Sequence, residues 1–153
     1  MNTRAFILSI LIAGLITGVL GNLPLLNLIN CALCIFAWLG GFLAVLFYKR
    51  FQHGGPVATP GQGAGLGALT GLIGAFVGAV VYAITSPFSF PLFTSLARFL
   101  QIEGDLPFTR GAGLWEIVAT AFFFLIVDAI LYPLFGALAG LITASIIKEP
   151  ATS

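Results

Sequence analysis

The stretch that decides the fold is residues 63–85, GAGLGALTGLIGAFVGAVVYAIT. It contains no Asp, Glu, Lys or Arg. At a rise of about 1.5 Å per residue, a helix of this length crosses a hydrocarbon core of about 30 Å. A lone strand would leave its backbone groups unpaired in lipid, so a helix is the structure that this stretch predicts.

The composition of the whole chain agrees with this stretch. Of its 153 residues, 59% are hydrophobic and 7% are charged, whereas soluble domains carry about 25% charged residues. So few ionisable side chains cannot cover a domain of this size in water, and we expect a lipid bilayer to surround most of the chain. The net charge of +1 gives a nucleic-acid partner no electrostatic basis. One His and two Cys argue against a four-ligand zinc site, and we expect no metal and no cofactor.

Three further apolar stretches complete the topology. We predict an all-α fold, an integral membrane four-helix bundle that forms one domain over 1–153, with spans at about 5–22, 28–48, 63–85 and 114–147. The first stretch lies close to the second, so we expect an uncleaved helix rather than a signal peptide. The fourth is longer than a span needs and contains Pro133, which predicts one kinked helix.

The connections differ in character. Residues 49–62 are predicted to form a flexible polar loop. Within 86–113, apolar residues recur at helical spacing from Pro91 onward: Leu92, Leu96, Phe99 and Leu100. This pattern predicts a short amphipathic helix lying in the interface of the outer loop, although a plain surface loop remains an alternative.

Basic residues predict the orientation. Arg4, Lys49, Arg50 and Lys148 fall on one side of the predicted topology, against Arg98 and Arg110 on the other. The positive-inside rule therefore places the N- and C-termini in the cytoplasm, and we expect a prokaryotic cytoplasmic membrane.

Small residues recur at spacings of three and four. They give a glycine-zipper pattern, which predicts close helix packing because backbones approach where side chains are absent. The predicted packing residues are Gly14, Gly18, Gly67, Gly71, Gly74, Gly78, Gly136 and Gly140. The pattern leaves open whether the partner helix belongs to the same chain, to a second copy or to another membrane protein.

The two cysteines, Cys31 and Cys34, form a C-x-x-C pair in the first turn of the predicted second helix. A thiol at a helix N-terminus is activated by the helix dipole, so the pair is a candidate redox centre. The alternative is that both are small residues filling a helix contact, and we prefer it.

Two resemblances bear on this pair. The string CALCIF at 31–36, together with the predicted topology, resembles the membrane family of quinone-linked thiol oxidases that form disulfide bonds. The resemblance implies a redox role for Cys31 and Cys34. That family has a second cysteine pair in its long outer loop, whereas residues 86–113 have none, and a basic residue soon after the C-x-x-C, whereas residues 36–48 have none.

A second resemblance covers more of the chain. Asn30-Cys31, the string WLGGFLAV at 38–45, the run at 63–78 and the ending at 136–147 are similar to a group of small prokaryotic membrane proteins with four predicted helices. Glycine-rich third and fourth spans characterise that group. The resemblance implies topology and no activity.

Asp128 is the remaining candidate, because an ionisable side chain within a span costs about 2.5–3.5 kcal/mol on insertion scales. It shares a helix face with Tyr132, and we expect Tyr82 and Asn30 at a similar depth. These four residues form a candidate intramembrane polar site. The acid could hold helices together, face the interface, or carry a proton or substrate.

We therefore expect a structural, scaffold or accessory membrane protein without an enzymatic site. The alternatives are a transporter or channel subunit using Asp128, and a thiol-disulfide oxidoreductase using Cys31 and Cys34.

Overall fold

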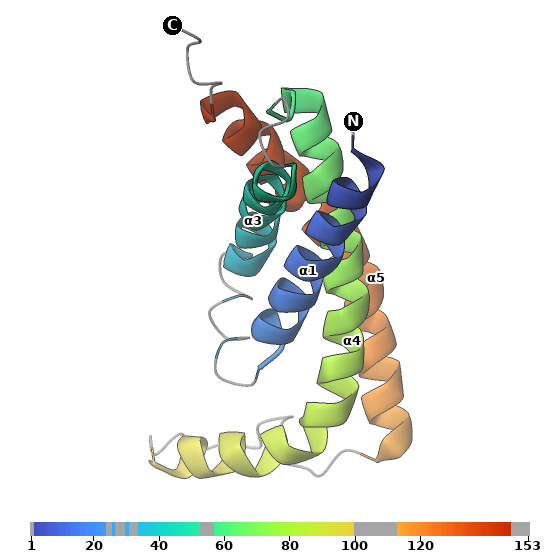
Figure 1. Ribbon diagram of the computed structural model, residues 1–153. Coiled ribbons are helices and arrows are strands. Elements are labelled where there is room, and N and C mark those ends of the chain that lie inside the picture. The colour runs from blue at the N-terminus through green and yellow to red at the C-terminus, as the bar shows by residue number, and fades with distance from the viewer. Residues whose placement is uncertain are drawn as a thin grey trace, which may run out of the picture.

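The computed structural model describes residues 2–23, 26, 30, 34–52, 57–99 and 113–147. This part of the chain is all-helical, as the sequence predicted, and its helices are α1 (Thr3–Gly21), α3 (Ile35–Phe51), α4 (Pro60–Phe99) and α5 (Leu114–Ile146) (Figure 1). Three segments are long and apolar enough to cross a membrane: α1, residues Pro60–Pro87 of α4, and α5.

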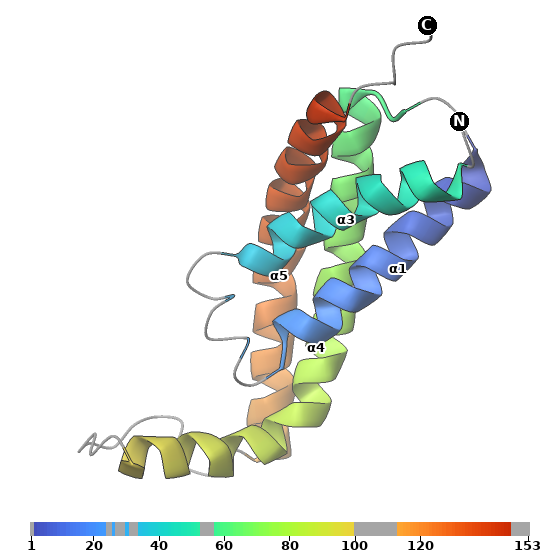
Figure 2. The ribbon, with the colours of Figure 1, turned by 60° about the vertical axis from the view of Figure 1, so that its left-hand side comes forward.

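The long helices α4 and α5 lie side by side and run in opposite directions (Figures 1 and 2). The shorter helices α1 and α3 pack against each other and against α4, and α3 also packs against α5. In both views the α4–α5 pair extends beyond the ends of α1 and α3, towards the bend in α4.

Helix α4 begins before residue 63, the predicted start, because the preceding residues form a cap. The Thr59 N–H donates to Oε1 of Gln62 at 3.1 Å, and the Gln62 N–H donates to Oγ1 of Thr59 at 3.3 Å. This reciprocal pair is a capping box, and Pro60 occupies the first helical position, where its missing N–H costs no hydrogen bond. Residues 60–62 therefore belong to the first turn of α4, which corrects the predicted loop through residue 62.

Helix α4 also continues past residue 85, its predicted end, and runs to Phe99. Figures 1 and 2 show its last part turned across the direction of the first. Pro87 lacks the N–H that would bond the carbonyl of Ala83, and Oγ of Ser86 donates to that carbonyl instead, at 3.3 Å. The helix predicted from Pro91 onward is thus the end of α4 rather than a separate element, and its predicted amphipathic face lies mostly outside the described side chains.

Helix α3 begins at Ile35, later than the predicted residue 28, and its N-cap is Cys34. The backbone of Cys34 has φ 47°, in the left-handed region, so the helix does not extend back through it. Oδ1 of Asn30 accepts the N–H of Phe36 at 3.2 Å and satisfies part of the first turn of α3. The predicted placement of Cys34 inside a helix is therefore wrong, because α3 begins only after that residue.

Helix α5 is one helix that runs through Pro133, as predicted, and the kink expected at Pro133 stays a prediction. At its start, the carboxylate of Glu116 accepts the N–H of Gly113 at 3.1 Å. A negative group in the first turn also complements the helix dipole.

Most large apolar side chains point outward and most inward ones are small or polar, with Tyr48, Leu66 and Val45 as the largest buried exceptions. Exposed examples are Phe76 at 63% and Ile130 at 65% of their full exposure, whereas Ala13, Ala44, Ser9 and Thr70 are completely buried. A helix exposing so much apolar surface to water would be unfavourable, and lipid removes that penalty. Interiors built from small residues are typical of helices that associate in a bilayer.

Candidate functional site

The closest helix contact joins α4 and α5 through glycines. A Cβ added at Gly67 would lie 1.8 Å from the carbonyl oxygen of Gly136, and one at Gly63 would lie 2.3 Å from that of Gly140. One turn further along α4, a Cβ at Gly71 would lie 2.4 Å from the carbonyl oxygen of Tyr132. Real Cβ atoms do not approach other atoms so closely. The two backbones can therefore touch only because these positions have no side chain.

Glycines also line the contact between α1 and α4. A Cβ at Gly14 would lie 2.7 Å from Cγ2 of Ile73, and one at Gly18 would lie 2.7 Å from the carbonyl oxygen of Gly74. A Cβ at Gly78 would meet Nδ2 of Asn22 at 2.3 Å. The neighbour of the α4 glycines thus changes along the helix, from α5 at Gly67 and Gly71 to α1 at Gly78.

All the predicted packing glycines lie at contacts between helices of this one chain. Gly63 of α4, which belongs to the same spacing pattern four residues before Gly67, also lies at such a contact, and the structure adds Gly41 on α3, where an added Cβ would lie 2.2 Å from the carbonyl oxygen of Gly136. The adjacent pair Gly40-Gly41 in the middle of an apolar stretch is a sequence signal for this contact. The predicted pattern missed it, because that pattern considered only glycines three or four residues apart.

Two threonines lie where α1, α3 and α4 meet. A Cβ added at Gly40 of α3 would be 3.3 Å from both Thr17 and Thr70. The hydroxyl of Thr17 donates to the carbonyl of Ala13 at 2.8 Å, a bond within its own helix. Oγ1 of Thr70 is buried and has no hydrogen-bond partner within the described part of the chain.

The candidate polar site is built around Asn30 and Tyr132. Both side chains are buried, and Nδ2 of Asn30 donates to the hydroxyl of Tyr132. Because Oδ1 of Asn30 also bonds the backbone of Phe36, one amide group joins the start of α3 to the middle of α5. Gly21 closes the site, since a Cβ there would lie 3.1 Å from the Tyr132 hydroxyl.

The other two predicted members of the polar site lie apart from this hydrogen bond. Asp128 is half-buried one turn before Tyr132 on α5, and Asn30 bonds Tyr132 rather than Asp128. The ring of Tyr82 packs edge-on against Phe124, with centroids 5.6 Å apart. The structure therefore brings Asn30 and Tyr132 into contact, with Asp128 one turn away on α5 and Tyr82 on α4 beside Phe124.

Of the candidate redox pair, Cys34 is described and Cys31 lies outside the described residues. The N–H of Cys34 donates to the carbonyl of Asn30 at 2.7 Å, and its own carbonyl accepts the N–H of Ala37 at 2.9 Å. Cys34 therefore marks the turn into α3, and the relation of the two sulfur atoms stays a prediction.

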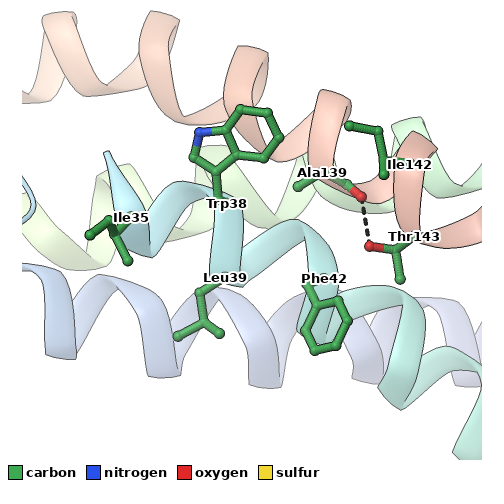
Figure 3. A pocket seen from close by; sticks show the side chains of 7 residues that line it. All are labelled: Ile35, Trp38, Leu39, Phe42, Ala139, Ile142 and Thr143. Carbon is green, nitrogen blue, oxygen red and sulfur yellow. Dashed lines mark hydrogen bonds between the residues drawn. The ribbon is translucent and has the colours of Figure 1, made fainter. Parts of the chain in front are cut away.

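A shallow groove of about 360 Å³ runs between α3 and α5 (Figure 3). Its lining is almost wholly apolar and comprises Ile35, Trp38, Leu39, Phe42, Ala139, Ile142 and Thr143. The one hydroxyl, that of Thr143, donates to the carbonyl of Ala139 at 2.7 Å and so needs no partner in the groove. The groove can accept apolar groups and offers nothing that would catalyse a reaction.

The described part of the chain thus defines a class of protein, one whose described residues form helices, three of them apolar enough to cross a membrane. Comparison with protein-family models, curated proteins and solved structures finds no match for this chain.

Proposed function

We propose that this protein is a small polytopic integral membrane protein that serves as a structural, scaffold or accessory component, with helices packed through glycine-rich faces. The observation that carries the proposal is the distribution of side chains. Glycine, alanine and hydroxyl residues fill most of the helix contacts, and most large aliphatic and aromatic residues are exposed, with Leu66 and Tyr48 among the buried exceptions. In a bilayer no hydrophobic force drives helices together, so close backbone contact supplies the packing energy.

The charged residues support one orientation. Arg4 at the start of α1 and Lys49 and Arg50 at the end of α3 are exposed at the end of the molecule where α4 begins (Figure 1). By the positive-inside rule this end faces the cytoplasm, which places the N-terminus there as well. The bent end of α4 then lies at the opposite membrane surface as an interfacial helix.

An accessory role requires a partner, and α5 has the surface for one. In the most apolar 18-residue stretch of α5, 6% of the residues are buried, compared with 44% in that of α1. We propose that a second copy or another membrane protein covers part of this surface and lipid covers the rest.

The test is to solubilise the tagged chain from membranes in mild detergent and to measure the protein mass of the particle, detergent excluded. We expect a mass that exceeds the 16.0 kDa of one chain. A particle of one chain would contradict the accessory role. Recovery from the aqueous fraction without detergent would contradict membrane insertion itself.

Asp128 supports a second candidate function, that of a transporter or channel subunit. It is half-buried within an apolar helix, one turn from the buried Asn30–Tyr132 hydrogen bond, and acids in such places often mark ion or proton paths. In reconstituted vesicles, Asp128→Asn is expected to abolish proton or cation flux if this candidate is correct. A wild-type protein without flux, or flux unchanged in Asp128→Asn, would contradict it.

A further inference from the structure

A second cavity lies at the basic end of the molecule, where α1 begins and α3 ends. It measures about 310 Å³ and is lined by Asn2, Arg4, Ala5, Leu8 and Phe51. The lining has two chemical zones. Asn2 and Arg4 supply polar groups at the tip of α1, whereas Leu8, one turn further along, and Phe51 of α3 supply apolar surface.

The polar zone carries the positive charge of Arg4, which no acidic side chain among the described residues offsets. Arg4 is in the first turn of α1, where the unpaired backbone N–H groups already produce a positive potential, and that turn contains no acidic residue. The side chain of Asn2 caps only one of these groups, the N–H of Ala5, at 3.3 Å. A basic residue at a helix N-terminus is disfavoured unless an anion lies nearby.

Two basic side chains at the neighbouring end of α3 add to this potential, against the negative dipole end of that helix. Lys49 and Arg50 are exposed in its last turn, next to Phe51, which lines the cavity. Unlike Arg4, these two residues complement the dipole of their own helix. An anion at Arg4 would therefore be attracted by the helix end, by Arg4 and by both neighbouring cations.

We propose that this cavity binds one anionic phospholipid, with the phosphate at Arg4 and an acyl chain against Leu8 and Phe51. The inference rests on the proposed membrane insertion. The guanidinium group can donate two parallel hydrogen bonds to phosphate oxygens, a geometry that arginine suits better than lysine. The apolar zone favours a lipid over free phosphate, because free phosphate would leave Leu8 and Phe51 uncovered.

The test uses the full chain in nanodiscs of equal parts phosphatidylglycerol and phosphatidylcholine, with retained lipid identified by native mass spectrometry. We expect preferential retention of phosphatidylglycerol. Arg4→Gln should weaken its binding about tenfold, because the phosphate loses its charge-assisted hydrogen bonds to the guanidinium group. Arg50→Gln is the matched control: it removes one of the neighbouring cations but does not line the cavity, so it should weaken the binding of phosphatidylglycerol much less than Arg4→Gln.

Three outcomes would overturn the proposal. Equal weakening by Arg4→Gln and Arg50→Gln would show general surface attraction, and equal retention of the two lipids would show no headgroup preference. Displacement of phosphatidylglycerol by inorganic phosphate alone would show a site for a free anion.

A third variant, Leu8→Ser, should weaken lipid retention, and the midpoints of thermal unfolding of all variants report whether they fold. A chain that inserts into nanodiscs without lipid preference contradicts this inference alone, whereas a chain that stays in the aqueous phase contradicts the proposed function.

Discussion

At the scale of single residues, Gly67 shows how the helices are held together. Its backbone touches Gly136 so closely that no side chain fits, whereas Gly65, two residues earlier, has nothing within 4 Å of the position of an added Cβ. The two glycines belong to the same helix and differ only in the face that they occupy. Alanine substitutions at the two positions therefore separate the effect of helix packing on stability from the effect of helix propensity.

We expect Gly67→Ala to destabilise the protein by more than about 2 kcal/mol, because the added methyl forces α4 and α5 apart. Gly65→Ala should be neutral or stabilise by up to about 1 kcal/mol, since alanine favours the helix. Thermal unfolding in detergent, followed by circular dichroism, measures both. Equal effects of the two substitutions would show that α4 and α5 do not meet at Gly67.

The Asn30–Tyr132 hydrogen bond gives a second test at this scale. Tyr132→Phe removes the hydroxyl and leaves the buried amide of Asn30 short of a partner, which should cost about 1 kcal/mol. Tyr82→Phe is the control, because the ring contact with Phe124 survives the loss of the hydroxyl. If the two substitutions lower the midpoint of thermal unfolding equally, the hydrogen bond does not join α3 to α5.

At the scale of helices, the sequence predicted the existence of the helices better than their ends. Length and apolar composition identified α1 and α5 nearly to the residue. The start of α4 depends on Thr59 and Gln62, a local capping signal in a stretch predicted to be a loop. The start of α3 depends on Asn30, whose side chain also contacts Tyr132, far away in sequence. Such a contact cannot be predicted from local spacing, because it exists only after the helices assemble.

The bend in α4 has a local cause and a direct test. Pro87 cannot bond the carbonyl of Ala83, so Pro87→Ala should restore that bond and straighten the helix. In a background without cysteines, spin labels at Leu72 and Phe99, both exposed, would report the change by pulsed electron resonance. We expect a longer distance in Pro87→Ala than in the parent. An unchanged distance would mean that Pro87 does not cause the bend.

At the scale of the whole molecule, the glycine pattern predicted close packing but not its partners. Its members on α4 share one face, and that face meets α5 near Gly67 and α1 near Gly78. The spacing of glycines along the sequence shows which face of a helix allows another backbone to approach closely. Which helix packs there depends on how the helices cross, and that is a property of the assembled molecule.

The proposed bilayer setting follows from the outward direction of the large apolar residues. It is tested most directly by a spin label at Phe76, which is 63% exposed on α4. In reconstituted vesicles, the account predicts that the label collides often with oxygen, which is concentrated in hydrocarbon, and rarely with a water-soluble nickel chelate. Frequent collision with the nickel chelate at this position would show that water, rather than lipid, surrounds the helix, and would contradict the account.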